Sequence, residues 1–307
     1  MYTPMLVPLV THPAYSYPFP AKHRFPMDKF DLLHRYLREQ GLAGSENTFR
    51  PGRCKAELIQ LAHCANYVSD FIDGRFTPEQ ARRMGLPWSE GLVRRTCISP
   101  AGTLLAAHLA LKFGVACHLA GGTHHAHRDF ASGFCIFNDL AISALALLRY
   151  TQLKRILIFD VDVHQGDGTA RILEQEPGVF TCSIHCEKNF PVRKARSDLD
   201  VNLQVGMGDD AYLAVVADTF SDLLLQFKPD LVLYDAGVDV FEGDPLGLLN
   251  ISLRGIAERD RCVLNLAARV GVPIATVIGG GYDRDQSALA RRHAICVEQA
   301  AAVFKTL

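Results

Sequence analysis

The chain has 307 residues, of which 49% are hydrophobic and 21% charged, a composition typical of globular proteins. These proportions exclude an intrinsically disordered chain, a collagen-like repeat and a disulfide-stapled miniprotein. The 32 Lys and Arg residues nearly cancel the 33 Asp and Glu residues, which leaves a formal net charge of −1. Because so small a charge produces no strong field, we expect no direct binding to nucleic acid and no attachment to anionic membranes.

Nine cysteines are spread along the chain, and no two of them form a C-x-x-C pair. An odd number without such pairs favours neither a disulfide framework nor a four-thiolate zinc site. We therefore expect free thiols in a reducing compartment, the cytoplasm. The segment Met1–His12 lacks the basic start and the small-residue cleavage site of a signal peptide, and no apolar stretch approaches the ~20 residues needed to cross a bilayer.

Short apolar runs rich in Val, Ile and Leu predict buried strands, because they do not alternate with polar residues. The predicted strands are Met5–Val10, Val115–Leu119, Arg155–Val161, Val179–Ile184, Leu231–Tyr234 and Ile274–Ile278. Apolar residues at helical spacing predict helices at Met27–Gln40, Lys55–Phe71, Pro100–Phe113, Asp139–Thr151, Asp209–Phe227, Arg254–Val270 and Gln286–Phe304. Strand–helix alternation from about residue 100 onward predicts an α/β fold with an open, doubly wound, mainly parallel sheet flanked by helices.

The sequence contains no linker, repeat or low-complexity tract, so we expect a single domain spanning residues 1–307. Residues 20–99 are mostly helical and rich in Pro and Gly, which predicts a helical cap packed on the sheet. Residues 100–285 form the α/β core and carry the motifs with catalytic potential. Ligands of such sheets bind beyond the carboxyl ends of the strands, and five strand-end loops here hold His, Asp or Tyr beside Gly.

The first motif follows the predicted strand at Arg155–Val161. Asp160, Asp162 and His164 are spaced two residues apart, so their side chains can point to the same face. Together with Asp244 from a later loop, Asp162 and His164 would give a catalytic metal three ligands and an open coordination position. Two oxygens and one nitrogen accept Zn²⁺ or Fe²⁺. The alternative is a solvated turn in which one carboxylate caps the following helix.

Two adjacent histidines, His124 and His125, follow the predicted strand at Val115–Leu119. Amide hydrolysis needs a base that activates water and an acid that protonates the leaving amine, and two imidazoles can share these roles. Asp160 and Asp167 are natural carboxylate partners to orient the two rings. Taken alone, either histidine could instead be a structural residue.

Three glycines and a tyrosine, Gly279–Tyr282, end the last predicted strand. Glycine lets the backbone approach a ligand closely. The phenol of Tyr282 could donate a hydrogen bond to the oxyanion of a tetrahedral intermediate. A phosphate-binding loop is the alternative, but neither a P-loop nor a dinucleotide-binding glycine pattern occurs at this position.

Four segments together resemble the motif series of the zinc-dependent histone deacetylases and their bacterial relatives: GGTHHAHRDFASGFCIFND, FDVDVHQGDGT, DAGVDVFEGDPLG and GGGYD. They occur in the family's order between about residues 100 and 285, and the relatives include acetylpolyamine amidohydrolases of the same arginase/deacetylase fold. Two further segments, HPAYSYPFPAKHRFPMDKF and NFPVRKARSDLDVNL, look most like the bacterial class IV-like branch.

The resemblance implies a role for each matching residue. It assigns Asp162, His164 and Asp244 as the ligands of one Zn²⁺. It gives His124 and His125 acid–base roles, with Asp160 and Asp167 as their respective partners. Tyr282 would polarise the scissile carbonyl. His125 would be the base towards water. The resemblance also implies a narrow substrate tunnel at Gly133, Phe134, Phe190 and Gly280. A structural K⁺ would lie near Asp160, Asp162, His164, Ser183 and Ile184, bound largely through carbonyl oxygens.

The expected activity is removal of an acyl group from Nε-acyl-lysine in a protein or peptide. The alternative is an amidohydrolase for acetylpolyamines or other small acylated amines. A cationic substrate of this kind would favour an acidic channel mouth. The basic cluster Arg193, Lys194 and Arg196 argues against such a substrate if the cluster lies at the rim. A two-manganese ureohydrolase is disfavoured, because His124 and His125 stand where it needs more carboxylates. A non-catalytic acyl-lysine-binding protein would have lost ligands, base or tyrosine, and all of these are present.

Two places depart from the family pattern. The loop after Phe190 reads PVRKARSDLD, where the better-known eukaryotic enzymes have a glycine-rich segment. The segment 72–100 shows no clear match to the rim aspartate that grips a peptide backbone in some members. Both departures concern the recognition of a protein substrate rather than the catalytic core.

Overall fold

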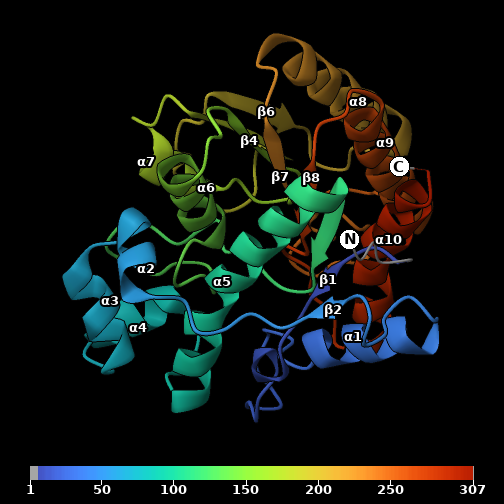
Figure 1. The fold of residues 1–307 in the computed structure, drawn as a ribbon. Coiled ribbons are helices and arrows are strands. Elements are labelled where there is room, and N and C mark those ends of the chain that lie inside the picture. The colour runs from blue at the N-terminus through green and yellow to red at the C-terminus, as the bar shows by residue number, and fades with distance from the viewer. Residues whose placement is uncertain (1–5, 307) are drawn as a thin grey trace.

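One parallel sheet of eight strands runs through the molecule (Figure 1). The computed structural model describes residues 6–306. Its strands are β1 (Leu9–Val10), β2 (Thr48–Phe49), β3 (Val115–His118), β4 (Ile156–Asp160), β5 (Val179–Cys186), β6 (Leu199–Leu203), β7 (Leu231–Asp235) and β8 (Ile274–Val277). They lie in the order β2-β1-β3-β8-β7-β4-β5-β6, and every neighbouring pair is parallel.

Each strand predicted from an apolar run has a counterpart in the sheet. The prediction at Met5–Val10 begins on a residue outside the described range, and β1 comprises only Leu9–Val10. Strands β2 and β6 were not predicted. Strand β2 is too short to leave a pattern, and β6 lies at the edge of the sheet, where Leu203 is its one fully buried residue. An edge strand needs no continuous apolar run, because one side of it faces water.

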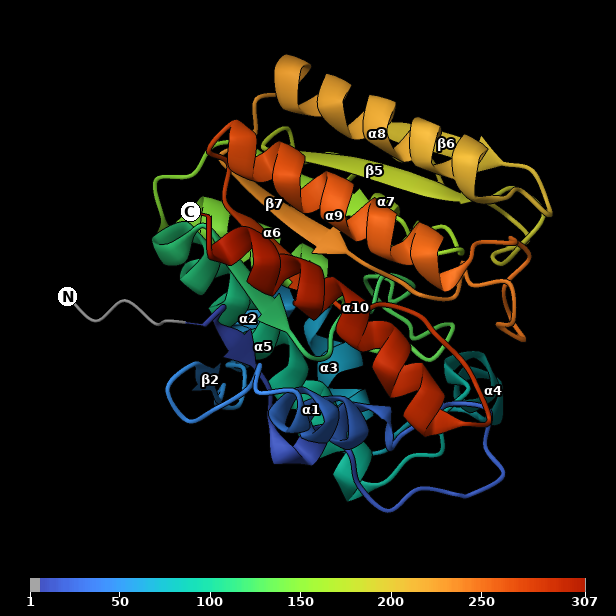
Figure 2. The same ribbon diagram turned by 90° about the vertical axis from the view of Figure 1, so that its right-hand side faces the viewer.

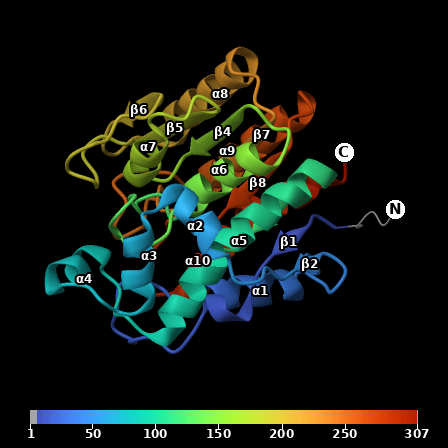
Figure 3. The same ribbon diagram turned by 60° about the vertical axis from the view of Figure 1, so that its left-hand side comes forward.

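Helices cover both faces of the sheet. They are α1 (Lys29–Glu39), α2 (Ala56–Ala62), α3 (Ala65–Ile72), α4 (Pro78–Met84), α5 (Glu90–Phe113), α6 (Asp139–Tyr150), α7 (Asp167–Leu173), α8 (Asp209–Gln226), α9 (Leu253–Arg269) and α10 (Gln286–Phe304), with a 3₁₀ turn η1 at Pro13–Tyr15. Helices α8, α9 and α10 cover one face (Figure 2), and α5, α6 and α7 cover the other (Figure 3). This confirms the predicted α/β fold, whereas the extent of the domain stays a prediction.

Helix α5 starts well before the predicted start at Pro100. Proline is favoured in the first turn of a helix, so in the sequence it resembles a start. The true start is capped by Ser89, whose hydroxyl accepts a hydrogen bond from the N–H of Leu92 at 3.1 Å. Pro100 lies inside the helix and has no N–H to donate. One turn earlier, the carbonyl of Cys97 accepts a hydrogen bond from the N–H of Cys54 at 2.7 Å, which ties α5 to the segment before α2.

The single helix predicted at Lys55–Phe71 is in fact two helices, α2 and α3, separated at His63 and Cys64. The backbone of both residues is extended at this break. The ring of His63 contacts the carbonyl of His127 through Nδ1 at 2.8 Å, and its Nε2 accepts a hydrogen bond from the N–H of Asn138 at 2.8 Å. The break therefore fixes the loop between β3 and α6 against the helical region.

The four central strands, β3, β8, β7 and β4, bring their carboxyl ends together at one edge of the sheet. Each is followed directly by one of the predicted catalytic loops. Of the helices within residues 6–306, none has both the length and the apolar character needed to pass through a bilayer.

Candidate active site

His124 lies among three buried carboxylates. Its Nδ1 lies 2.8 Å from Oδ2 of Asp160 and 3.9 Å from Oδ2 of Asp235, and its Nε2 lies 3.8 Å from Oδ1 of Asp162. Burial favours the neutral ring, but these carboxylates outweigh burial and raise the pKa of His124 well above its usual range. These carboxylates therefore favour the protonated form of His124.

His125 has only one carboxylate partner. Its Nδ1 lies 2.7 Å from Oδ1 of Asp167, and the other oxygen of Asp167 lies 3.1 Å from Nε2 of His127. Burial and the charge of His124 lower the pKa of His125 to about 4, against the opposing effect of Asp167. The pKa values of the two neighbouring histidines are thus shifted in opposite directions, although their ring centroids are only 4.2 Å apart. His125 is neutral at pH 7 and can accept a proton.

A second buried group at the same edge consists of Asp162, His164 and Asp239, whose ligand atoms all lie within 4.8 Å of one another. Nδ1 of His164 lies 3.0 Å from Oδ1 of Asp162 and 3.1 Å from Oδ2 of Asp239. The other oxygen of Asp239 accepts a hydrogen bond from the N–H of Val163 at 2.9 Å. Two of the three predicted metal ligands are therefore brought together, with a carboxylate that was not predicted.

Asp244, the third predicted ligand, is held beside this group rather than within it. Its Oδ1 accepts a hydrogen bond from the N–H of Leu246 at 2.9 Å, and its Oδ2 accepts one from the N–H of Tyr282 at 2.7 Å. Burial and the charge of Asp239 raise the pKa of Asp244 to about 7. The two carboxylates are thus close enough to repel one another.

This donor set fits a divalent cation. Asp162, Asp239 and Asp244 are buried, and their negative charges exceed what the imidazole of His164 can neutralise. Buried carboxylates need a cation or a proton, because the low dielectric makes an unpaired charge costly. Oxygen and imidazole nitrogen ligands are those that Zn²⁺ and Fe²⁺ accept.

The glycine loop after β8 closes one side of this group. The N–H of Gly280 donates a hydrogen bond to Oδ2 of Asp162 at 2.7 Å. A Cβ atom at this position would collide with carboxylate oxygens of Asp239 and Asp162, so only glycine fits. The backbone N–H of Tyr282, next but one, binds Asp244. Burial and the charge of Asp239 raise the pKa of the Tyr282 phenol well above its usual range, so it keeps its proton.

A cavity of about 440 Å³ leads from the protein surface to His125, His164 and Tyr282. Its walls include three of the four predicted tunnel residues, Gly133, Phe134 and Phe190, whereas Gly280 lines a smaller cavity around Asp162 and His164. The rings of His125 and Phe190 meet edge to face with their centroids 4.8 Å apart. A side chain at Gly133, where φ is +54°, would press on the His125 ring, with its Cβ 2.6 Å from Cδ2. The glycine and the aromatic rings therefore leave a narrow apolar passage to the buried groups.

The histone deacetylase domain matches residues 23–299. The chain belongs to the histone deacetylase family. An uncharacterised protein of Picosynechococcus sp. is 49% identical over 297 residues, which cover 97% of this chain and 99% of that protein. The histone deacetylase clr6 of Schizosaccharomyces pombe is 31% identical over 291 residues, covering 87% of this chain and 70% of that protein. Histone deacetylase 1 of Homo sapiens is 28% identical over 289 residues, covering 87% of this chain and 59% of that protein.

These relationships confirm the family that the motifs indicated, and they support a deacetylase-type hydrolase. The buried His and Asp groups fit metal binding in such an enzyme.

For the structural K⁺, the register of the sheet places Asp160 of β4 beside Ser183 of β5, with Ile184 next along the strand. The K⁺ itself stays a prediction, because carbonyl ligands belong to every residue type.

Three residues of this deacetylase-family site escaped the sequence analysis: His127, Asp235 and Asp239. His127 is the third histidine of HHAH, a visible signal that was left unused. Asp235 ends β7, and neither of its oxygens accepts a hydrogen bond from the residues that the structure describes. Asp239 follows in the same loop as Asp244, and both aspartates of that loop could have been considered as ligands.

Proposed function

We propose that this protein is a zinc-dependent amidohydrolase that removes acyl groups from Nε-acyl-lysine in proteins or peptides. The observation that supports this most strongly is a pair of buried histidines beside the Asp162–His164 group: His124 and His125 lie 2.8 and 2.7 Å from the carboxylates of Asp160 and Asp167. A base and an acid at the end of one apolar passage are what amide hydrolysis requires.

Asp162, His164 and Asp239, whose ligand atoms lie within 4.8 Å of one another, would hold one Zn²⁺, with Fe²⁺ as the other metal that this donor set accepts. When bound, the metal would polarise the scissile carbonyl and lower the pKa of a water molecule to about 7. Asp244, the ligand expected from the sequence, would support the site from beside it, since its two oxygens are held by the N–H groups of Leu246 and Tyr282.

His125 accepts a proton from the attacking water while the oxygen of that water bonds to the carbonyl carbon. Asp167 supports this step, because its carboxylate holds Nδ1 of His125 and stabilises the imidazolium that forms. The C–N bond then breaks, and a proton from the histidine pair passes to the leaving amine. The products are a carboxylate and a free amine.

Tyr282 stabilises the negative oxygen of the tetrahedral intermediate by donating its phenolic hydrogen bond. Its raised pKa keeps the hydrogen in place at all physiological pH values. The side chain of Phe134 packs beside it, with ring centroids 5.9 Å apart. The aliphatic part of an acyl-lysine would lie between Phe134 and Phe190, where each buried methylene contributes about 0.8 kcal/mol.

A fluorogenic acyl-lysine peptide tests this function. Acetyl and longer fatty-acyl versions should be compared for the wild type, with and without a chelator, and for Tyr282→Phe. We expect chelator-sensitive hydrolysis of at least one acyl form, restored by Zn²⁺ or Fe²⁺, and a loss of about two to three orders of magnitude in kcat for Tyr282→Phe. Chelator-insensitive turnover, or no turnover with any acyl chain, would overturn the proposal.

A further inference from the structure

The mouth of the substrate passage is lined by arginines. Arg24 comes from the segment before α1, and Arg82 and Arg83 come from the last turn of α4. These residues share one cavity with His125 and Phe190. Within residues 6–306, that cavity has no Asp or Glu in its wall. The outer end of the passage is therefore positively charged.

Arg24 and Arg82 are the two cations free to act on a ligand. Both are exposed, and neither forms an ion pair with any residue in the described part of the chain. Arg83 is already engaged, because its guanidinium lies 3.4 Å from Glu79 and 4.8 Å from the ring centroid of Phe130.

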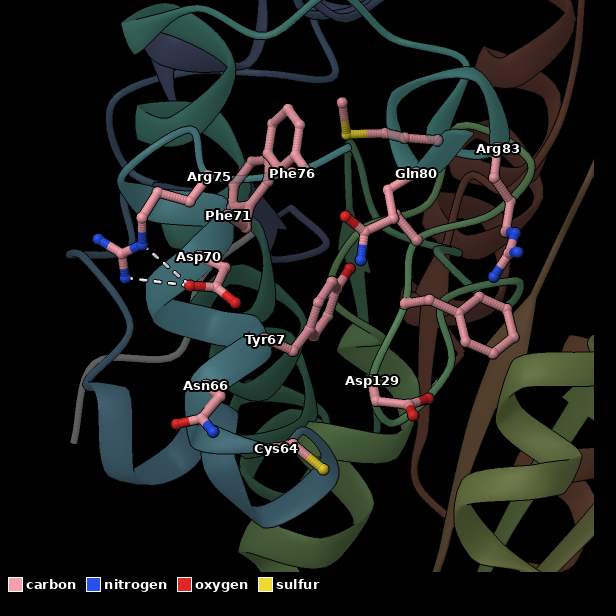
Figure 4. Close-up of a pocket in the computed structure, with 13 residues that line it drawn as sticks. Cys64, Asn66, Tyr67, Asp70, Phe71, Arg75, Phe76, Gln80, Arg83 and Asp129 are labelled. Carbon is pink, nitrogen blue, oxygen red and sulfur yellow. Dashed lines mark hydrogen bonds and ion pairs between the residues drawn. The ribbon is translucent and has the colours of Figure 1, made fainter. Parts of the chain in front are cut away.

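Figure 4 shows where Arg83 is held: at the edge of a second cavity, of about 220 Å³, across from the paired side chains of Asp70 and Arg75. Phe130 belongs to the wall of this second cavity. The stacking of Arg83 on Phe130 therefore draws its charge towards that wall and away from the passage.

The basic cluster that the sequence analysis weighed for the rim lies elsewhere. Arg193, Lys194 and Arg196 are not in the wall of the mouth. The ammonium of Lys194 is bound by the carbonyls of Asn189 and Pro191, at 2.6 and 2.8 Å. The charge at the mouth comes instead from Arg24 and from the arginines of α4, a helix within the segment 72–100 where no rim aspartate was found.

We infer that the enzyme selects acyl-lysine peptides with an acidic residue directly beside the modified lysine, and that Arg24 and Arg82 bind that residue. The inference rests on the proposed function, since it assumes that the acyl-lysine chain occupies the passage. The backbone and neighbours of that lysine would then lie at the mouth, within the ~10 Å over which exposed charges interact at 0.1 M salt. A polyamine chain carries positive charge at the same place and would be repelled.

Two peptides that differ only in charge test the inference: one with Glu on both sides of the acyl-lysine and one with Lys at both positions. For the wild type we expect kcat/KM to be about tenfold higher for the acidic peptide than for the basic one, because of a lower KM rather than a higher kcat. In 0.5 M NaCl the ratio of the two kcat/KM values should approach one. The double variant Arg24→Glu/Arg82→Glu should reverse the preference. Arg261→Glu, the same charge change on the exposed outer side of α9, should leave it intact.

Binding of the same two peptides, labelled and followed by fluorescence anisotropy, separates this inference from the proposed function. Tighter binding of the acidic peptide without hydrolysis of either peptide would refute the proposed function and support the charge preference. Hydrolysis of both peptides with equal kcat/KM and equal Kd would overturn the inference and leave the proposed function standing. A preference unchanged in Arg24→Glu/Arg82→Glu would also overturn it.

Discussion

Replacing Asp167 with Asn tests the division of labour between the two catalytic histidines. The substitution keeps the shape of the side chain and removes its charge. Oδ1 of Asp167 lies 2.7 Å from Nδ1 of His125, a short contact in which the carboxylate stabilises the imidazolium. A hydrogen bond to a charged group contributes about 1.5–3 kcal/mol, against about 1 kcal/mol for a neutral one. The difference of about 0.5–2 kcal/mol predicts a fall in kcat of about 2- to 30-fold.

The same variant should move the pH dependence in a defined direction. Asp167 partly opposes the effects of burial and of the His124 charge, which lower the pKa of His125 to about 4. Without the negative charge the pKa falls further, so the acid limb of the kcat/KM profile should move to lower pH while the maximum rate drops.

Steady-state kinetics across pH 4–8 would measure both effects. Asp230→Asn is the matched control, because that carboxylate accepts hydrogen bonds from the N–H groups of Lys154 and Arg155 at the opposite edge of the sheet. An unchanged kcat together with an unmoved acid limb in Asp167→Asn would refute the reasoning, since His125 would then not depend on its carboxylate.

Two further predictions concern stability and the metal group. Burial lowers the pKa of His63 to about 4, below its usual value of about 6.5. Between these two pH values the unfolded chain therefore binds more protons than the folded protein, and stability falls as the pH drops through this window. Between pH 7 and pH 5, the protonation of His63 alone should lower the free energy of unfolding by about 2 kcal/mol. In urea titrations, His63→Gln, which can keep both hydrogen bonds, should therefore lose about 2 kcal/mol less than the wild type over this pH range. An equal fall in the free energy of unfolding of both proteins would contradict this. Gly280→Ala should abolish most activity, because the added methyl group displaces the Asp162 and Asp239 carboxylates. Normal turnover in this variant would show that the close approach of the Gly280 backbone to these carboxylates is dispensable.

Much of the fold follows directly from the sequence. Strands β4 and β7 are covered on both faces, so their apolar runs are continuous and easily recognised. Elements without that constraint were missed or misplaced. Helix α5 contains Pro100 because surrounding contacts outweigh the helix-breaking effect of proline, and no local pattern reports such contacts.

The site shows the same division. His124, His125, Asp162 and His164 stand next to strand ends, so the parallel topology alone places them at one edge. Asp239 could not be ranked against Asp244, because both lie in one irregular loop whose path depends on tertiary packing. The arginines at the mouth were also invisible, since α4 reaches the passage through the packing of the helical region and not through its own sequence pattern.

The central claim is that Asp162, His164 and Asp239 hold one divalent ion, with Asp244 beside them. Metal analysis and Zn²⁺ titration of the purified protein test it most directly, using wild type, Asp244→Asn and Asp239→Asn. The account predicts one Zn²⁺ per chain in the wild type, an affinity lowered about 10–100-fold in Asp244→Asn, and a larger loss in Asp239→Asn. A wild type that binds no Zn²⁺, or an Asp239→Asn protein that binds it as tightly as the wild type, would contradict the account.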